Sequence, residues 1–217
     1  MTTNQAIQYK DSMKVPEPTL RRLPWYLSNV KLLKQRGERY VSSTQISKEI
    51  NIDASQIAKD LSYVNISGRT RVGYEVDTLI AVLEDFLGFT DMHKAFLFGV
   101  GSLGGALLRD SGLKHFGLEI VAAFDVNPEL VGTTLNGIPI FHSSEFEQKM
   151  REYDVNIGVL TVPIEIAQCI TDTMIAGGIK AVWNFRIRVP ENIVVQNTSL
   201  YAHLAVMFNR LNFNEIE

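Results

Sequence analysis

A glycine-rich turn between two apolar runs is the feature that most constrains what this 217-residue chain can fold into. The first run covers residues 95–98, and Gly99, Gly101 and Gly104 follow it. The second run ends in a carboxylate, Asp125, about twenty residues further on, as the fingerprint requires. A strand, a glycine turn, a helix, a second strand and an acid in this order are typical of a βαβ unit that binds a dinucleotide.

Each glycine has its own physical role in such a unit. Gly99 permits the tight turn, Gly101 lets the backbone approach a pyrophosphate, and Gly104 lets the helix pack closely on the strand. Asp125 is expected to accept hydrogen bonds from the adenosine ribose hydroxyls, and residues 126–129 contain no Lys or Arg for a 2′-phosphate. The pattern predicts NAD(H) rather than NADP(H), although the glycine spacing alone would equally suit a structural turn.

The position of this unit limits what else the chain can contain. About 120 residues follow its start, which leaves hardly any room for a separate substrate domain of roughly 100 to 150 residues. No apolar run approaches the roughly 20 residues of a membrane span. The single cysteine, Cys169, excludes an intramolecular disulfide, and we expect it to be buried in a helix. These features predict a cytoplasmic protein without a bound metal.

Positive charge is concentrated in the amino-terminal third. Residues 10–71 contain twelve Lys or Arg and six Asp or Glu, so this segment carries +6 and the rest of the chain −9, for a net charge of −3. A basic domain on an acidic protein favours a polyanionic partner. A solvated basic surface would have the same composition.

The same segment has the pattern of a helix-turn-helix. An apolar stripe predicts one helix over 18–35; its residues are Leu20, Leu23, Leu27, Val30 and Leu33. A second helix is predicted within 41–50, and it begins with hydroxyl residues that suit a cap. After a short break, Asp53 is placed to cap a third helix over 54–64.

The third predicted helix is amphipathic. It turns Ile57, Leu61 and Val64 inward and presents small polar groups and one lysine on the opposite face. These outward residues are Ser55, Gln56, Lys59, Ser62 and Tyr63. A helix of this kind, reached through a tight turn, can enter a major groove.

A short hairpin, the wing, is predicted directly after this helix, over residues 65–74. Gly68 and Gly73 bracket Arg69 and Arg71, with alternating residues between them. The two arginines are well placed for phosphates or for a narrow minor groove. An ordinary hairpin with solvated arginines would look the same.

Several short motifs along nearly the whole chain are more specific than the glycine spacing. The most specific are Lys59-Asp-Leu-Ser-Tyr63 and Thr161-Val-Pro163. The others are Val15-Pro-Glu, Arg22-Leu23, Tyr26-Leu27, Val41-Ser-Ser, Val72-Gly-Tyr74, Gly99-Val-Gly-Ser-Leu-Gly-Gly-Ala-Leu107, Phe124-Asp125, Ile157-Gly158, Ala176-Gly-Gly-Ile-Lys180 and Asn184-Phe185. In this order they resemble the Rex family of redox-sensing transcriptional repressors.

The resemblance implies an α/β protein in three parts. Residues 1–90 would form a winged helix-turn-helix DNA-binding domain, residues 91–197 a Rossmann-like parallel-sheet domain that binds NAD(H), and residues 198–217 a helix exchanged within a dimer. The protein would be a homodimeric repressor and not an enzyme. It would bind a palindromic double-stranded operator and release it when NADH occupies the Rossmann domain.

Spacing and resemblance together assign roles to individual residues. Cofactor binding is expected of Gly99, Val100, Gly101, Ser102, Leu103, Gly104, Asp125, Val126, Thr161, Val162, Pro163, Asn184 and Phe185. DNA binding is expected of Ser43, Ser55, Gln56, Lys59, Ser62, Tyr63, Arg69 and Arg71. Coupling between the two sites is expected of Arg22, Asp110, Ser199 and Leu200.

A few positions depart from the usual pattern of the family. Ala58 stands where relatives carry Arg, and the wing arginines are displaced. We therefore expect a different operator preference, because an Arg bidentate to guanine contributes about 1 to 3 kcal/mol of discrimination. Asp110 stands where relatives tend to carry Tyr, and Ser199-Leu200 stands where they commonly carry Asp followed by an apolar or aromatic residue. We therefore expect altered cofactor affinity or redox discrimination.

Two other functions remain open from the sequence. A small NAD-dependent oxidoreductase would need a proton donor near the nicotinamide, and the four histidines form no recognisable constellation. A repressor that senses another nucleotide, such as coenzyme A, would fit a compact Rossmann domain, but Asp125 argues against it.

Overall fold

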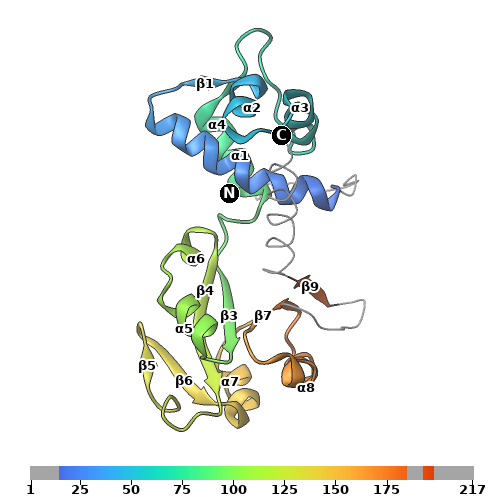
Figure 1. Cartoon of the computed structure of the whole chain (residues 1–217). Helices are drawn as coiled ribbons and strands as arrows, with labels where there is room; N and C mark the ends of the chain where they lie inside the picture. Colours follow the sequence, from blue (N-terminus) through green and yellow to red (C-terminus); the bar gives the residue numbers. More distant parts are fainter. Residues whose placement is uncertain (1–14, 185–192, 198–217) are drawn as a thin grey trace, which may run out of the picture. The chain divides into compact units, whose positions relative to one another are not determined.

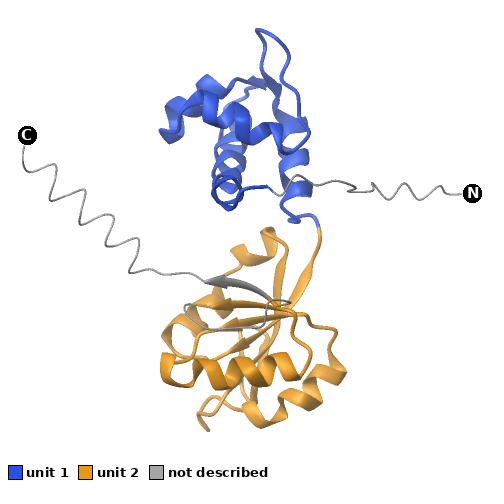
Figure 2. Cartoon of the chain, turned by 90° about the vertical axis from the view of Figure 1, so that its right-hand side faces the viewer, with its two compact units in different colours: residues 1–90 blue, residues 91–217 orange. Residues whose placement is uncertain are grey.

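The computed structural model describes residues 15–184 and 193–197, and the chain divides into two compact units, Met1–Thr90 and Asp91–Glu217 (Figures 1 and 2). Each unit has its own hydrophobic core. The helix expected over 198–217, with Ser199 and Leu200, lies outside the described residues, as does Phe185. None of the helices within the described residues is long and apolar enough to cross a membrane.

The first unit combines helices with a small antiparallel sheet. Its elements are α1 (Glu17–Gln35), β1 (Tyr40–Val41), α2 (Ser43–Ile50), α3 (Ala54–Ser62), β2 (Tyr74–Glu75) and α4 (Val76–Phe86). β1 pairs with β2, and the wing connects α3 to β2. The three helices predicted in this unit are confirmed, with ends that differ by one or two residues.

Two side-chain caps start the helices of the helix-turn-helix. Ser42 accepts a hydrogen bond from the backbone N–H of Gln45 and begins α2. Asp53 accepts hydrogen bonds from the backbone N–H groups of Ser55 and Gln56 and begins α3, as predicted. Such caps satisfy N–H groups that have no partner within a helix, so the local sequence fixes where both helices start.

The inward face of α1 differs from the prediction at its first turn. Leu20, expected in the apolar stripe, is 41 % exposed, whereas Leu23, Leu27, Val30 and Leu33 are buried as expected. Thr19 takes the inward position instead, because its hydroxyl donates a hydrogen bond to buried Asp60. The expectation for Leu20 was wrong.

The second unit is built on a parallel sheet. Its elements are β3 (His93–Phe98), α5 (Ser102–Arg109), α6 (Gly112–His115), β4 (Leu118–Asp125), β5 (Thr134–Leu135), β6 (Ile138–His142), η1 (Ser143–Glu145), α7 (Phe146–Glu152), β7 (Ile157–Leu160), α8 (Ile164–Ala176), β8 (Ala181–Asn184) and β9 (Val194–Asn197). The strand order is β5-β6-β4-β3-β7-β8-β9, and every pair except β5 with β6 is parallel. From β6 to β9 this is the doubly wound order of a Rossmann fold.

Helices cover both faces of this sheet. On one face Phe96 and Phe98 of β3 pack in a cluster with Phe146 of α7 and Met174 of α8. On the other face Ala95 and Leu97 pack in a cluster with Leu108 of α5. Successive residues of a strand point to opposite faces, so a continuous apolar run suits a strand that is buried on both sides.

Cys169 is exposed on α8, and the expectation that it would be buried was wrong. The buried residues of that helix are Ala167, Thr171 and Met174, which recur at the spacing of one helix face. The amphipathic helix itself is confirmed.

Candidate cofactor and nucleic-acid sites

The glycine turn lies where β3 meets α5, at a switch point of the sheet. Within the sheet, β3 lies between β4, which follows it in the chain, and β7, which comes later in the chain. In such folds ligands bind in the crevice outside the carboxyl ends of the strands at that point. Topology therefore directs attention to the ends of β3, β4, β7 and β8.

The three glycines meet different surroundings. Gly99 has φ +92°, and a Cβ there would lie 2.8 Å from the backbone oxygen of Thr161. A Cβ on Gly104 would lie 1.9 Å from the oxygen of Gly99, whereas a Cβ on Gly101 would meet no atom of the described residues within 4 Å. The tight turn and the close packing of α5 are thus present, and space remains open at Gly101.

The amino-terminal end of α5 faces this open space without a side-chain cap. Its N-cap residue is Gly101, which has no side chain to accept hydrogen bonds from the first turn. Uncapped N–H groups and the helix dipole favour an anion at this position. A phosphate group fits the chemistry of this helix end.

Two polar residues tie neighbouring strand ends to the turn. Asp125, at the end of β4, accepts hydrogen bonds from the backbone N–H groups of Val100 (2.6 Å), Val126 (2.7 Å) and Asn127 (2.8 Å). The hydroxyl of Thr161, at the end of β7, lies 2.7 Å from the oxygen of Gly99. The predicted acid is therefore part of the scaffold of the turn, and its ribose contact stays a prediction, because a carboxylate can accept further hydrogen bonds.

Asn184, at the end of β8, is the least satisfied polar group of this site. The residue is 4 % exposed, and its Nδ2 atom has no hydrogen-bond partner among the residues that the structure describes. A buried donor without a partner is costly and rare, so it suggests an acceptor supplied by a ligand.

Apolar side chains stand exposed at the same edge of the sheet. Leu103 is 40 % exposed in the first turn of α5, Val126 is 67 % exposed after β4, and Ile164 is 64 % exposed at the start of α8. Among the remaining predicted residues, Ser102 and Pro163 are exposed, Val162 is half-buried and Val100 is buried. The edge thus offers apolar contact beside an anion-binding helix end, which suits a nucleotide.

The outward face of α3 carries the residues predicted for a major groove. Ser55, Lys59 and Ser62 are exposed, and Gln56 and Tyr63 are half-buried. Ala58 lies exposed among them and has no hydrogen-bonding group.

The wing is shorter than the predicted hairpin. Arg69 and Gly73 exchange backbone hydrogen bonds of 2.8 and 2.9 Å, and this single bridge closes the loop. Arg71 has φ +65° at the loop tip. Gly73 has φ +94°, and a Cβ there would lie 2.4 Å from the oxygen of Val41. The wing therefore returns tightly against β1, which only glycine permits at that position.

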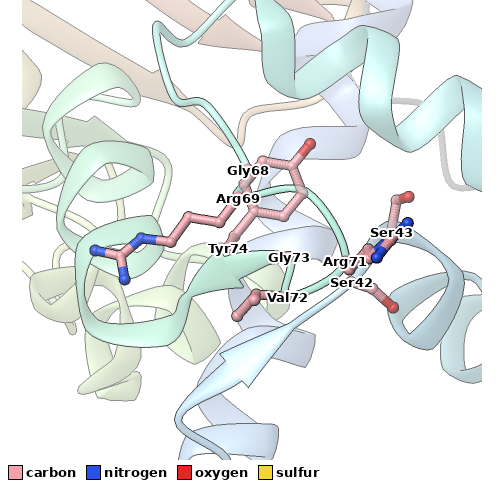
Figure 3. A pocket seen from close by; sticks show the side chains of 8 residues that line it. All are labelled: Ser42, Ser43, Gly68, Arg69, Arg71, Val72, Gly73 and Tyr74. Atoms are coloured by element: carbon pink, nitrogen blue, oxygen red, sulfur yellow. The ribbon is translucent and has the colours of Figure 1, made fainter.

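A cavity of about 350 Å³ lies between the wing and the start of α2 (Figure 3). It is lined by Ser42, Ser43, Gly68, Arg69, Arg71, Val72, Gly73 and Tyr74. The Arg71 side chain lies on the side of the two serines, whereas Arg69 extends away from them (Figure 3). The Arg69 guanidinium carbon is 6.0 Å from the centre of the Tyr40 ring. The cavity thus brings Ser43 and Arg71 together, whereas the guanidinium of Arg69, which also lines it, points away from the two serines.

A buried carboxylate, Asp60, was missed from the sequence. It is 0 % exposed, although its neighbour Lys59 is exposed. Its position was readable, because Ile57, Asp60, Leu61 and Val64 recur at the spacing of one buried helix face. The acid was counted as surface charge, since a lone carboxylate is seldom buried unless it is paired.

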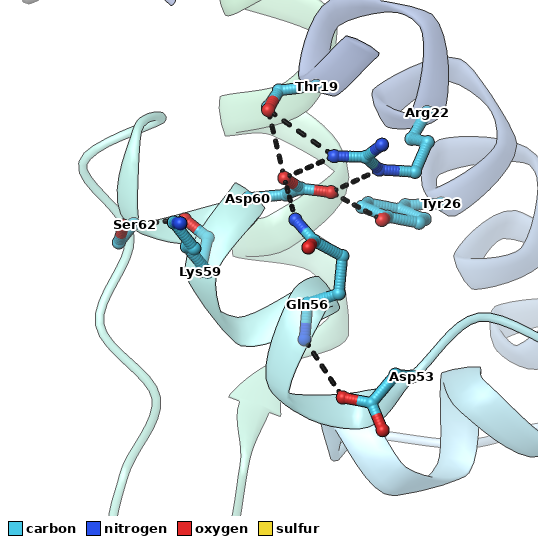
Figure 4. Close-up of polar contacts among 8 residues, drawn as sticks. All are labelled: Thr19, Arg22, Tyr26, Asp53, Gln56, Lys59, Asp60 and Ser62. Carbon is cyan, nitrogen blue, oxygen red and sulfur yellow. Dashed lines mark hydrogen bonds and ion pairs between the residues drawn. The ribbon is translucent and has the colours of Figure 1, made fainter. Parts of the chain in front are cut away.

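Asp60 accepts hydrogen bonds from four side chains, three of which lie on α1 and join that helix to α3 (Figure 4). Arg22 donates from Nε to Oδ2 (2.6 Å) and from Nη2 to Oδ1 (2.8 Å), and Tyr26 donates to Oδ2 (2.6 Å). Thr19 and Gln56 each donate to Oδ1 at 2.9 Å. Burial alone would raise the pKa of Asp60, but the hydrogen bonds from Arg22, Tyr26, Thr19 and Gln56 outweigh it and hold this pKa at about 2. Burial and the neighbouring carboxylate raise the pKa of Tyr26.

The two described coupling residues lie in different units. Arg22 is on α1, where it pairs with Asp60. Asp110 is exposed at the carboxyl end of α5, at the far end of that helix from the glycine turn, and accepts a hydrogen bond from the N–H of Gly112 (2.9 Å). Within the described residues, no group of three or more His, Cys, Asp or Glu could hold a metal ion.

Comparisons with known proteins match both units. A family model described as the N-terminus of a putative DNA-binding protein matches residues 14–62, and one described as a CoA binding domain matches residues 90–187. The chain is 90 % identical to a redox-sensing transcriptional repressor Rex from Bacteroides fragilis, over 100 % of both chains.

Solved structures agree with this similarity. RSP in complex with β-NAD⁺ and operator DNA has a TM-score of 0.86 and 29 % identity, over 93 % of this chain and 94 % of that one. RSP in complex with β-NADH has a TM-score of 0.85 and 30 % identity, over 94 % and 97 %. The predicted fold, a winged helix-turn-helix followed by a Rossmann-like domain, is confirmed, and the chain belongs to the Rex family of redox-sensing transcriptional repressors.

Proposed function

We propose that this chain represses transcription by binding operator DNA through its first unit and NAD(H) through its second, and that NADH causes release of the DNA. The observation that carries the proposal is its likeness, along nearly the whole chain, to a solved protein that holds β-NAD⁺ and operator DNA together. The identity of 90 % to a named Rex repressor supports the same function.

The cofactor residues fit the parts of a dinucleotide one after another along the edge of the sheet. The pyrophosphate would lie over Gly101 and the first turn of α5, where the backbone is open. The ribose hydroxyls would donate hydrogen bonds to the carboxylate of Asp125, whose negative charge would repel a 2′-phosphate. Asn184, with its unpaired buried N–H, would hold a polar group toward the nicotinamide end. When bound, the nicotinamide supplies the oxidised or reduced state that is sensed.

The DNA residues fit a groove contact and a phosphate contact. The outward face of α3 would enter the major groove with Ser55, Gln56, Lys59, Ser62 and Tyr63. Ser43 and Arg71 would hold a backbone phosphate at the wing cavity, because a hydroxyl and a guanidinium both donate to phosphate oxygens. Arg69, directed elsewhere, would reach a different part of the duplex.

We further propose a homodimer on a palindromic operator, located in the cytoplasm and without a metal. A two-fold dimer places two recognition helices on successive half-sites. The cofactor would act as a signal and would not be turned over. Arg22 and Asp110 remain the proposed coupling residues among those described.

Coenzyme A is a second candidate for the effector, because the family model that matches residues 90–187 is described as a CoA binding domain. Its adenosine carries a ribose phosphate, which the carboxylate of Asp125 would oppose. We therefore rank it behind NADH.

The test is a titration of the protein bound to a fluorescent operator duplex, with an operator selected from random palindromic sequences. NADH, NAD⁺, NADPH and coenzyme A are added separately, while DNA release is followed by anisotropy and NADH by absorbance. We expect NADH to release the DNA without being consumed and the other three to have little effect. Release by coenzyme A alone would favour the second candidate.

A further inference from the structure

The carboxylate of Asp60 is saturated by donors from two helices. Thr19, Arg22 and Tyr26 reach it from α1, and Gln56 reaches it from the preceding turn of α3 (Figure 4). The first three bind it from α1, Thr19 and Tyr26 as buried residues and Arg22 as a half-buried one, so they hold α3 against α1. Gln56 is different, because it belongs to the outward, half-buried flank of the helix that is proposed to enter the groove.

The chemistry of the pair fixes the orientation of the Gln56 amide. An ionised carboxylate only accepts hydrogen bonds, so Gln56 can approach Asp60 only with its NH₂ group. A flipped amide would direct Oε1 at the carboxylate oxygen, and two acceptors repel each other. The pKa of about 2 keeps Asp60 ionised at neutral pH, which maintains this constraint. One N–H of Gln56 is thereby used. Among the described residues, Oε1 and the second N–H have no hydrogen-bond partner, so they can bind another molecule.

We infer that Asp60 is a positioning residue for base recognition, whose carboxylate sets the Gln56 amide to offer one acceptor and one donor to an adenine in the major groove. This rests on the proposed function. Adenine presents its N6 amino group as a donor and N7 as an acceptor, which a Gln amide can bind in a bidentate manner.

The other polar groups on this face are less suited to two-point recognition. The Ser55 hydroxyl donates to Asp53, and the Ser62 hydroxyl donates to the backbone oxygen of Lys59 at 2.6 Å. The Lys59 ammonium is a point charge without a planar donor and acceptor pair. Within α3, which is described throughout, Gln56 is the only amide side chain.

The experiment measures operator binding by the full-length chain on duplexes in which each adenine in turn is replaced by 7-deazaadenine, which lacks the N7 acceptor. The variants are Asp60→Asn, Gln56→Ala and the double variant. Thr19→Val is the matched control, because it removes another hydrogen bond to the same Oδ1 atom and leaves the Gln56 bond in place. Thermal unfolding of each variant is followed in parallel by circular dichroism.

We expect the wild-type chain and Thr19→Val to lose about tenfold in affinity at one adenine per half-site, as a bidentate contact implies. Asp60→Asn and Gln56→Ala should lose this discrimination, and the double variant should lose no more than either. The physical reason for Asp60→Asn is that its own amide can offer a donor to Gln56, so the Gln56 amide is free to flip.

Three results would overturn the inference. If Asp60→Asn kept the adenine discrimination, or if Thr19→Val lost it equally, Asp60 would have only a structural role. If the wild-type chain did not distinguish its operator from random DNA, the proposed function would fail together with the inference. Where Asp60→Asn does not fold, hydrogen exchange of the Gln56 side-chain amide in the wild-type chain decides. Protection of this amide supports the inference, and exchange at the rate of a free amide overturns it.

Discussion

Acid should weaken the first unit by a calculable amount through Asp60. The carboxylate has a pKa of about 2 in the folded chain against an ordinary value of 3.8. Because the folded value is the lower one, Asp60 stabilises the fold above about pH 4, and this contribution is lost as pH falls through its folded pKa. The shift corresponds to a total of about 2 kcal/mol, of which about 1 kcal/mol is lost by pH 3 and most by pH 2.

The measurement compares the wild-type chain with Asp60→Asn, since all other carboxylates titrate in both. Of the two tryptophans, Trp25 is in the first unit and Trp183 in the second. With Trp183→Phe in both proteins, Trp25 is the tryptophan that remains. Because Trp25 is 65 % exposed in the fold, urea unfolding of the first unit is followed by the fluorescence anisotropy of Trp25, which falls when α1 loses its order. At pH 7 we expect Asp60→Asn to be less stable by about 3 kcal/mol, because it leaves Arg22 without its buried charged partner.

The difference between the two proteins should shrink by about 2 kcal/mol between pH 5 and pH 2. A constant difference over this range would mean that the Asp60 pKa is not depressed, and the reasoning from its hydrogen bonds would be refuted. A difference that grew in acid would give the shift the opposite sign.

Three further predictions concern the sites themselves. Gly104→Ala should destabilise the second unit by about 1 to 3 kcal/mol, because its Cβ would lie 1.9 Å from a backbone oxygen. It should also weaken NADH binding as measured by calorimetry. The control, Gly101→Ala, should leave the stability of the unit intact and weaken only NADH binding, and equal stability of the two variants would contradict this. Arg71→Ala should reduce the slope of log operator affinity against log salt concentration by about 1, as expected for the loss of one phosphate contact. The control, Arg36→Ala, removes an exposed arginine that pairs with a glutamate and should leave the slope unchanged. A slope for Arg71→Ala equal to that of the wild-type chain would mean that Arg71 does not contact the DNA. Asp125→Ala should weaken NADH binding and leave operator binding without nucleotide unchanged, and retained NADH affinity in a titration would limit the acid to the three backbone hydrogen bonds it accepts.

The parts of the fold that could be predicted are those set by local rules. The glycine turn, the Asp53 cap and the inward face of α3 depend on residues close in sequence, and the structure has them as expected. The second apolar run likewise ends β4 at Asp125. Strands, turns and helix caps are determined by residues that are close in sequence, so they can be predicted from the local sequence alone.

The parts that could not be predicted depend on partners far away in the chain. Asp60 is buried because three residues of α1, around forty positions earlier, complete its hydrogen bonds. Leu20 is exposed for the same reason, since Thr19 is drawn inward. Cys169 was misplaced because α8 also exposes Ile164 and Ile166, so hydrophobicity does not define its buried face. A single sequence does not give such pairings. The sequence predicted only a set of outward residues on α3, whereas the structure shows that one of them, Gln56, is hydrogen-bonded to buried Asp60.

The coupling free energy that a redox signal needs in order to change operator affinity is similar to the free energy of one hydrogen bond to Asp60. A tenfold change in operator affinity requires a coupling free energy of about 1.4 kcal/mol, and operator DNA must then lower NADH affinity by the same factor. A hydrogen bond to a charged group has a net value of about 1.5 to 3 kcal/mol. Arg22, the proposed coupling residue of the first unit, donates two such bonds to the carboxylate that also holds Gln56. Loss or gain of one of these bonds is therefore of the size that a tenfold change in operator affinity requires.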